Sequence, residues 1–150
     1  MVVILTRIQR ATLVDLLDQI IPNEDGMPGA GEISAGYIES VVLVSPRTAH
    51  IILDILEATA TAAHAHHSKP FSDLVDSAKK SSLKMVEDQD RELFAAFVRL
   101  VYSGYYINSA VINRLGPTAR KPQPEGFLIS PFDPLIVENV RTLGPRYRET

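Results

Sequence analysis

The chain has 150 residues, of which 45% are hydrophobic and 22% are charged, and this is the composition of one globular domain. Its formal net charge is −3, and no block of about five like charges occurs, which argues against a nucleic-acid partner or an anionic membrane surface. Cysteine is absent, and this excludes a disulfide framework, a thiolate nucleophile and any Cys-based metal centre.

Helix signals begin close to the N-terminus. Thr6 and Gln9 form a capping box, leucines and isoleucines follow at helical spacing, and Pro22 ends the run. Ser45 and Pro46 are typical of an N-cap followed by a first-turn proline. The predicted helices cover residues 6–21, 35–44, 45–67, 74–86, 93–105, 108–116 and 133–144.

The expected fold class is therefore all-α. We predict a compact bundle of about five to seven helices that forms a single helical domain over residues 1–150. Long irregular loops rich in proline and glycine are expected near residues 22–32 and 117–131. Loops of this length are usually functional, and we expect these two to be ordered by a partner rather than by themselves.

The sequence contains no complete set of residues typical of a catalytic site. His64 and His67 have the spacing of two metal ligands on a helix, but no third ligand is near them in the sequence. The segment 26–31 is rich in glycine, yet it lacks the Lys-Ser or Lys-Thr of a phosphate loop, so we interpret it as a turn. Catalytic, cofactor-binding and metal-binding residues are all predicted to be absent from this chain.

The end of the most apolar helix carries an unusual aromatic group. Gly104 inside that helix predicts a close approach of another backbone, because glycine costs about 1 kcal/mol relative to alanine there. Tyr105 and Tyr106 are adjacent and must point in different directions, so one of them can pack in the core while the other faces a partner.

Several short segments occur together in a recognisable order. The first comprises Leu13 and Ile20-Ile21-Pro22-Asn-Glu-Asp-Gly-Met-Pro-Gly-Ala-Gly31. It is followed by Phe94–Phe97 through Gly104-Tyr105-Tyr106, then Leu115-Gly116, Gly126-Phe127, Pro131–Pro134, and Val140-Arg141 with Tyr147-Arg148. In this order, the segments together resemble the gluconate 2-dehydrogenase subunit 3 family.

The resemblance implies a non-catalytic small subunit. Its large partner would be an FAD-dependent dehydrogenase of the glucose–methanol–choline type that oxidises a sugar or sugar acid, and the small subunit would stabilise, mature or help to export it. FAD and the catalytic residues are then expected on the partner, with no cofactor on this chain. Exported complexes of the family often include an electron-accepting cytochrome.

The sequence as written has no secretory signal, no paired arginines and no segment of about 18 apolar residues. We therefore expect a cytoplasmic protein without membrane insertion, with co-export on a partner to the periplasm as the alternative. The missing signal argues against the cytochrome.

The two loops and the aromatic helix end give a candidate partner interface. It comprises Met27, Pro28, Gly29, Gly104, Tyr105, Tyr106, Phe127, Pro131 and Phe132. Two other functions remain open at this point. One is a metal-dependent helical enzyme that uses His64 and His67, and the other is a free-standing helical adaptor or homo-oligomer.

Overall fold

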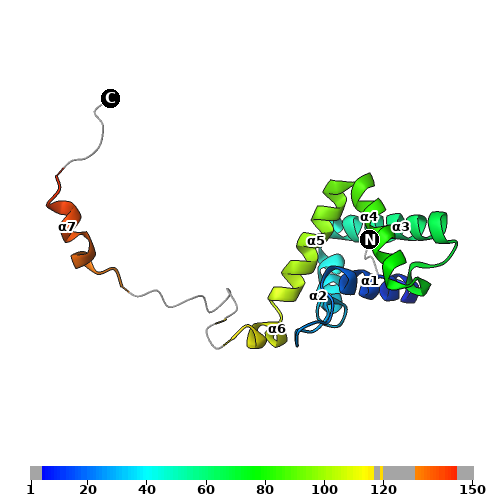
Figure 1. Cartoon of the computed structure of the whole chain (residues 1–150), viewed down its shortest axis with the longest axis horizontal. Coiled ribbons are helices and arrows are strands. Elements are labelled where there is room, and N and C mark those ends of the chain that lie inside the picture. The colour runs from blue at the N-terminus through cyan, green and yellow to red at the C-terminus, as the bar shows by residue number, and fades with distance from the viewer. Residues whose placement is uncertain (1–4, 117–118, 120–130, 145–150) are drawn as a thin grey trace, which may run out of the picture. The chain divides into compact units, whose positions relative to one another are not determined.

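The computed structural model describes residues 5–116, 119 and 131–144. The chain divides into two compact units, Met1–Ala119 and Arg120–Thr150 (Figure 1). The described residues form helices, turns and one isolated antiparallel bridge between Glu24 and Met27. The all-α fold class is confirmed, whereas the assignment of residues 1–150 to a single domain stays a prediction.

The first unit is a bundle of helices. Its elements are α1 (Arg7–Ile20), α2 (Ala30–Val44), α3 (Pro46–His67), the 3-10 turn η1 (Phe71–Asp73), α4 (Asp76–Gln89), α5 (Arg91–Tyr106) and α6 (Ser109–Arg114). In the described part of the second unit, η2 (Pro134–Val137) runs into α7 (Glu138–Arg141).

Local capping chemistry sets most helix starts where the sequence predicts them. Thr6 and Gln9 form the reciprocal capping box of α1, and the Ser45 hydroxyl accepts a hydrogen bond from the Thr48 N–H at the start of α3. Asp90 caps α5 and Asn108 caps α6 in the same way. Each cap satisfies a backbone N–H that has no partner within its own helix.

The core is built around α5, which contacts every other helix of the first unit. Phe97, Val101 and Tyr105 recur every four residues on one face of α5 and are at most 2% exposed. They pack in a cluster with fully or almost fully buried side chains from the surrounding helices. Those side chains are Leu13, Leu16 and Leu17 of α1, Ile38 of α2, Ile52 and Ile55 of α3, Val86 of α4 and Val111 of α6.

The segment over residues 22–32 differs from the expectation of a long irregular loop. Helix α2 begins at Ala30 instead of Ala35, and its N-cap, Gly29, has no side chain to offer. The carboxylate of Asp18 on α1 takes that role, because its Oδ1 accepts a hydrogen bond of 2.7 Å from the Gly31 N–H. The Ala30 N–H donates to the Ile21 carbonyl at 2.9 Å, so contacts within the chain order this turn.

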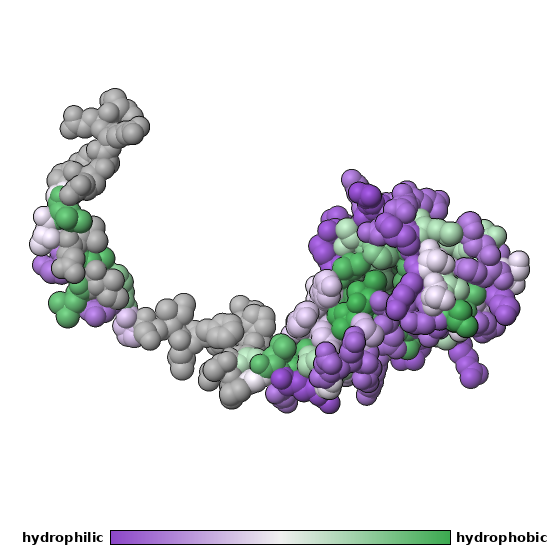
Figure 2. Space-filling view, viewed as in Figure 1, coloured by the Kyte–Doolittle hydropathy of each residue, from purple (hydrophilic) through white to green (hydrophobic). Residues whose placement is uncertain are grey.

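The described part of the second unit has little apolar surface buried. Phe132, Leu135 and Leu143 are 69%, 74% and 56% exposed. Figure 2 shows apolar residues on the surface of this segment. A four-residue helix such as α7 gains too few hydrogen bonds to offset the cost of helix nucleation, so its stability depends on packing.

None of the described helices is both long enough and apolar enough to cross a bilayer.

The Asp18 contact generates a test with an internal control. A Cβ added at Gly31 would lie 2.5 Å from Asp18 Oδ2 and 2.7 Å from the Val14 carbonyl oxygen. We expect Gly31→Ala to lower the free energy of unfolding by about 1–3 kcal/mol. Gly36, in the same helix, has no atom within 4 Å of an added Cβ, and Gly36→Ala should raise that free energy by up to about 1 kcal/mol. Urea denaturation measures both changes, and a Gly31→Ala protein as stable as the parent would contradict the Asp18 contact.

Candidate partner-binding surface

The structure divides the predicted interface residues between the interior and the surface. Pro28, Gly29, Gly104 and Tyr105 are buried within the first unit, and Met27 is half-buried. Tyr106, Pro131 and Phe132 are exposed. Phe127 lies outside the described residues. The predicted set is therefore not one continuous surface, and the interface role stays a prediction for its exposed members.

Tyr105 connects two distant parts of the bundle. Its hydroxyl donates a hydrogen bond of 2.8 Å to the Pro28 carbonyl, and its side chain is 2% exposed. A side chain with this burial is not available to a partner in this conformation, so Tyr105 acts as an internal link instead of the anchor that the sequence suggests. Burial is the main cause that raises the pKa of Tyr105, and the neighbouring Tyr106 raises it further. The charge of Arg114 opposes this rise.

Gly104 lies in close contact with α2, but the atoms nearest to it belong to side chains and not to the backbone that the sequence predicts. A Cβ added there would lie 2.6 Å from Tyr37 Cδ1 and 3.2 Å from Ser34 Cβ, both on α2. The Asn108 side chain, which caps α6, reaches the Ile33 carbonyl of α2 at 3.5 Å. These contacts hold the end of α5 against α2 and fix which tyrosines face outward.

An aromatic and aliphatic surface lies on the outer side of the same helix end. Tyr102 and Tyr106 are 46% and 50% exposed, and their ring centroids are 6.1 Å apart. Ile107, the C-cap of α5, is 42% exposed. Sequence reasoning missed Tyr102 and Ile107 as site residues. Val101 and Tyr105 are four residues apart and buried, and Tyr102 and Tyr106 have the same spacing one position later. This second pair could have identified the exposed face of the helix from the sequence.

The histidines do not come together as a metal site in the described part of the chain. His64 and His66 are exposed, and His67 Nε2 lies 3.4 Å from the Ser81 hydroxyl. Over residues 5–116, 119 and 131–144, no three His, Asp or Glu side chains gather as they would around a metal ion. The third ligand that the metal-dependent alternative requires does not come from these residues.

The glycine-rich segment 26–31 begins as a turn, as the sequence predicts, but its last two residues belong to α2. Asp25 and Gly26 adopt positive φ angles of 52° and 79°, and the Asp18 carboxylate lies at the N-terminus of α2. A phosphate approaching that N-terminus would meet a negative charge already bound to the backbone.

Surface hollows occur in the described part of the first unit. One, of about 440 Å³, lies between α1 and α3 and has apolar side chains such as Ile8, Leu53 and Leu56. Another, of about 300 Å³, is lined by side chains that include Asp76, which accepts a hydrogen bond of 2.7 Å from Gln19 and pairs with Lys80 at 3.0 Å. Gln19 first, and then Lys80, lower the pKa of Asp76, so this carboxyl is poorly suited to donate a proton near neutral pH.

The packing at Gly104 gives one test. We expect Gly104→Leu to unfold the bundle or to destabilise it by more than about 2 kcal/mol, because the new side chain would push α5 away from α2. His66→Ala, at an exposed position, should change the free energy of unfolding by less than about 0.5 kcal/mol. Thermal melts followed by circular dichroism compare the two. Gly104→Ala provides a milder variant for measurement if Gly104→Leu does not fold, and equal melting temperatures for all variants would contradict the close approach.

The buried hydroxyl of Tyr105 gives a second test. Tyr105→Phe leaves the Pro28 carbonyl without its donor and should cost about 1 kcal/mol. Tyr102→Phe, which changes an exposed ring in the same helix, should be nearly neutral.

The same pair of variants predicts a pH dependence. The pKa of Tyr105 is higher in the folded protein than the ordinary value of about 10 in the unfolded chain. Its neutral form therefore stabilises the fold fully below pH 10, and this stabilisation is lost as the pH rises through the folded pKa. The parent and Tyr102→Phe should lose more stability above pH 10 than Tyr105→Phe does. Identical alkaline profiles for all three proteins would show that the hydroxyl is not held as described.

The region of the chain that matches a known protein family coincides with the helical bundle. No curated protein and no solved structure matches the chain. The model of the family described as gluconate 2-dehydrogenase subunit 3 matches residues 7–117, from the first residue of α1 to just beyond α6. The match confirms the family resemblance over the bundle and does not extend to residues 131–144. Because it covers well over half of the 150 residues, the chain belongs to the gluconate 2-dehydrogenase subunit 3 family.

Proposed function

We propose that this chain is a non-catalytic subunit that binds a large FAD-dependent dehydrogenase of the glucose–methanol–choline type and stabilises or matures it. The family match carries this proposal, because it covers the entire folded bundle and names a dehydrogenase subunit. FAD and the groups that oxidise the sugar or sugar acid are then carried by the large subunit.

Exposed apolar side chains in both units support a binding role. Tyr102, Tyr106 and Ile107 lie on the surface of the bundle, and Phe132 and Leu135 on the surface of the second unit. Aromatic residues carry a large share of the binding energy at protein interfaces, whereas on a lone subunit they leave apolar area in water. A permanent complex of two different subunits commonly buries about 2,000 Å² or more in total, which is more than one small patch can supply.

The chemistry of the described residues also favours a binding role over catalysis. The carboxylates near the end of α1 are engaged in structural contacts: Asp18 with the Gly31 N–H, and Asp15 with Lys79 at 3.3 Å. The proposal therefore assigns no catalytic residue and no cofactor to this chain. Purified alone, it should show no flavin absorbance and contain no stoichiometric metal.

Co-expression with a large flavoprotein dehydrogenase subunit tests the proposal. The large subunit produced alone should be insoluble, poor in flavin or short-lived, and co-expression of this chain should restore soluble, flavin-loaded enzyme in a co-purifying complex. Gly104→Leu is the matched negative variant, because the loss of bundle packing should abolish the rescue. His66→Ala is the positive control and should rescue as well as the parent.

Two results would overturn the proposal. One is a large subunit that has full flavin content, stability and turnover without this chain. The other is sugar oxidation by this chain alone, which would make it an enzyme in its own right.

A further inference from the structure

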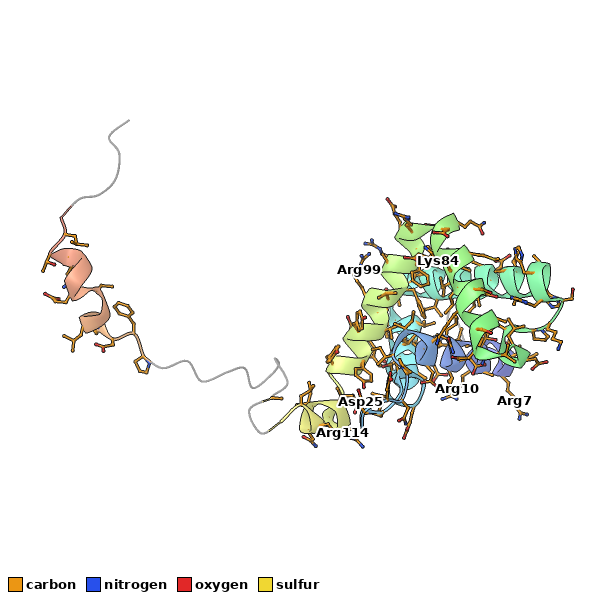
Figure 3. The ribbon with its side chains drawn as sticks, viewed as in Figure 1. Arg7, Arg10, Asp25, Lys84, Arg99 and Arg114 are labelled. Carbon is orange, nitrogen blue, oxygen red and sulfur yellow. The ribbon has the colours of Figure 1, made fainter. Side chains whose placement is uncertain are left out.

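The charges of the chain are segregated along its sequence. Acidic residues outnumber basic ones before Leu93, whereas the stretch from Leu93 to Pro124 contains no Asp or Glu. Within that stretch, Arg99 on α5 and Arg114 on α6 are exposed, and Figure 3 shows both on the outside of the bundle. From Leu93 onward, the last two helices of the first unit therefore carry two exposed arginines and no carboxylate, on a chain that is negative as a whole.

The exposed aromatic residues lie on the same helix face as one of these arginines. Arg99, Tyr102 and Tyr106 follow one another at spacings of three and four residues, so they form one stripe along α5. Ile107, the C-cap of α5, is exposed next to the end of the stripe. We call Arg99, Tyr102, Tyr106, Ile107 and Arg114 the docking face.

The docking face is held rigidly from behind. Tyr106 packs edge-on against Tyr105, with ring centroids 5.2 Å apart, and Tyr105 is fixed to the Pro28 carbonyl. Gly104 keeps this part of α5 in close contact with α2. A partner that binds here meets side chains whose backbone is already ordered, so less conformational entropy is lost on association.

We propose that the docking face binds the large flavoprotein subunit at an apolar patch bordered by carboxylates. This inference rests on the proposed function and adds to it the surface and the chemistry of the contact. Tyr106 and Tyr102 supply the apolar centre, and the two arginines at the edge pair with Asp or Glu of the partner and accelerate its approach.

Charge argues against a second copy of this chain as the occupant. In a two-fold symmetric dimer the same patch faces itself, so the arginines of one copy would approach those of the other. With no acidic residue between Leu93 and Pro124, the docking face cannot neutralise its own charge in such a contact. A partner of the opposite sign does so.

Binding kinetics of the purified full-length chain with the flavoprotein subunit test the proposal. Tyr106→Ser should weaken the complex about 30-fold or more, mainly through faster dissociation, as expected for an anchor residue. Arg99→Glu should slow association about tenfold at low salt, and the difference should shrink as salt is added.

Matched control variants lie elsewhere on the bundle. Val44, at the end of α2, is 81% exposed and provides Val44→Ser, while the exposed Arg47 of α3 provides Arg47→Glu with the same change in net charge as Arg99→Glu. Both controls should bind within about twofold of the parent. Variants that bind as tightly and as fast as the controls would overturn the docking face while leaving the proposed function intact.

Hydrogen exchange on the unmodified complex provides a measurement that does not depend on variants. Residues 99–115 should gain protection when the flavoprotein subunit binds. Protection confined to other segments, or variants that change only the self-association of this chain, would overturn the inference. A parent chain that does not bind the flavoprotein at all would overturn the proposed function, and the docking face with it.

Discussion

The hydrogen bond from Tyr105 to the Pro28 carbonyl is the contact on which the rest of the surface depends. It joins the central helix to a turn 77 residues away in sequence, and it gives the carbonyl of the buried Pro28 a hydrogen-bond donor. Because Tyr105 points inward to make this bond, its neighbours Tyr102 and Tyr106 lie beside it at the edge of the buried face, where their rings are about half exposed. The adjacent Gly104 lets α2 come close enough for the geometry to hold. One buried hydroxyl thus decides which aromatic rings are left for a partner.

The turn at the other end of that bond is itself organised by a distant side chain. Asp18 reaches from α1 to the first turn of α2, where Gly29 and Gly31 leave room for its carboxylate. A Cβ at either glycine would overlap with Asp18. The glycines of this segment therefore allow two helices to pack closely. Glycine-rich segments often let a phosphate approach the backbone, but here the carboxylate of Asp18 occupies that position.

Local patterns explain the parts of the fold that the sequence could predict. The caps at Thr6, Ser45 and Asn108 join residues that are two or three positions apart, so they can be predicted from a short stretch of sequence. The early start of α2 was missed because its cap, Asp18, lies 13 residues from Gly31. The burial of Tyr105 follows from the four-residue repeat with Phe97 and Val101, but its bond to Pro28 is a long-range contact that no local pattern contains. The same non-local contacts convert part of the predicted interface into interior.

The contrast between the two units bears on how a complex would form. The bundle has a continuous core and presents the docking face on ordered helices, so it can bind without folding first. In residues 131–144 the short helical turns leave Phe132, Leu135 and Leu143 exposed, and any surface that covers them also has to compensate for the entropy of ordering them. The bundle is therefore the part suited to set the specificity and rate of encounter. Exposed residues of the second unit can then add apolar area once the first contact holds the partner nearby, because the second contact is intramolecular.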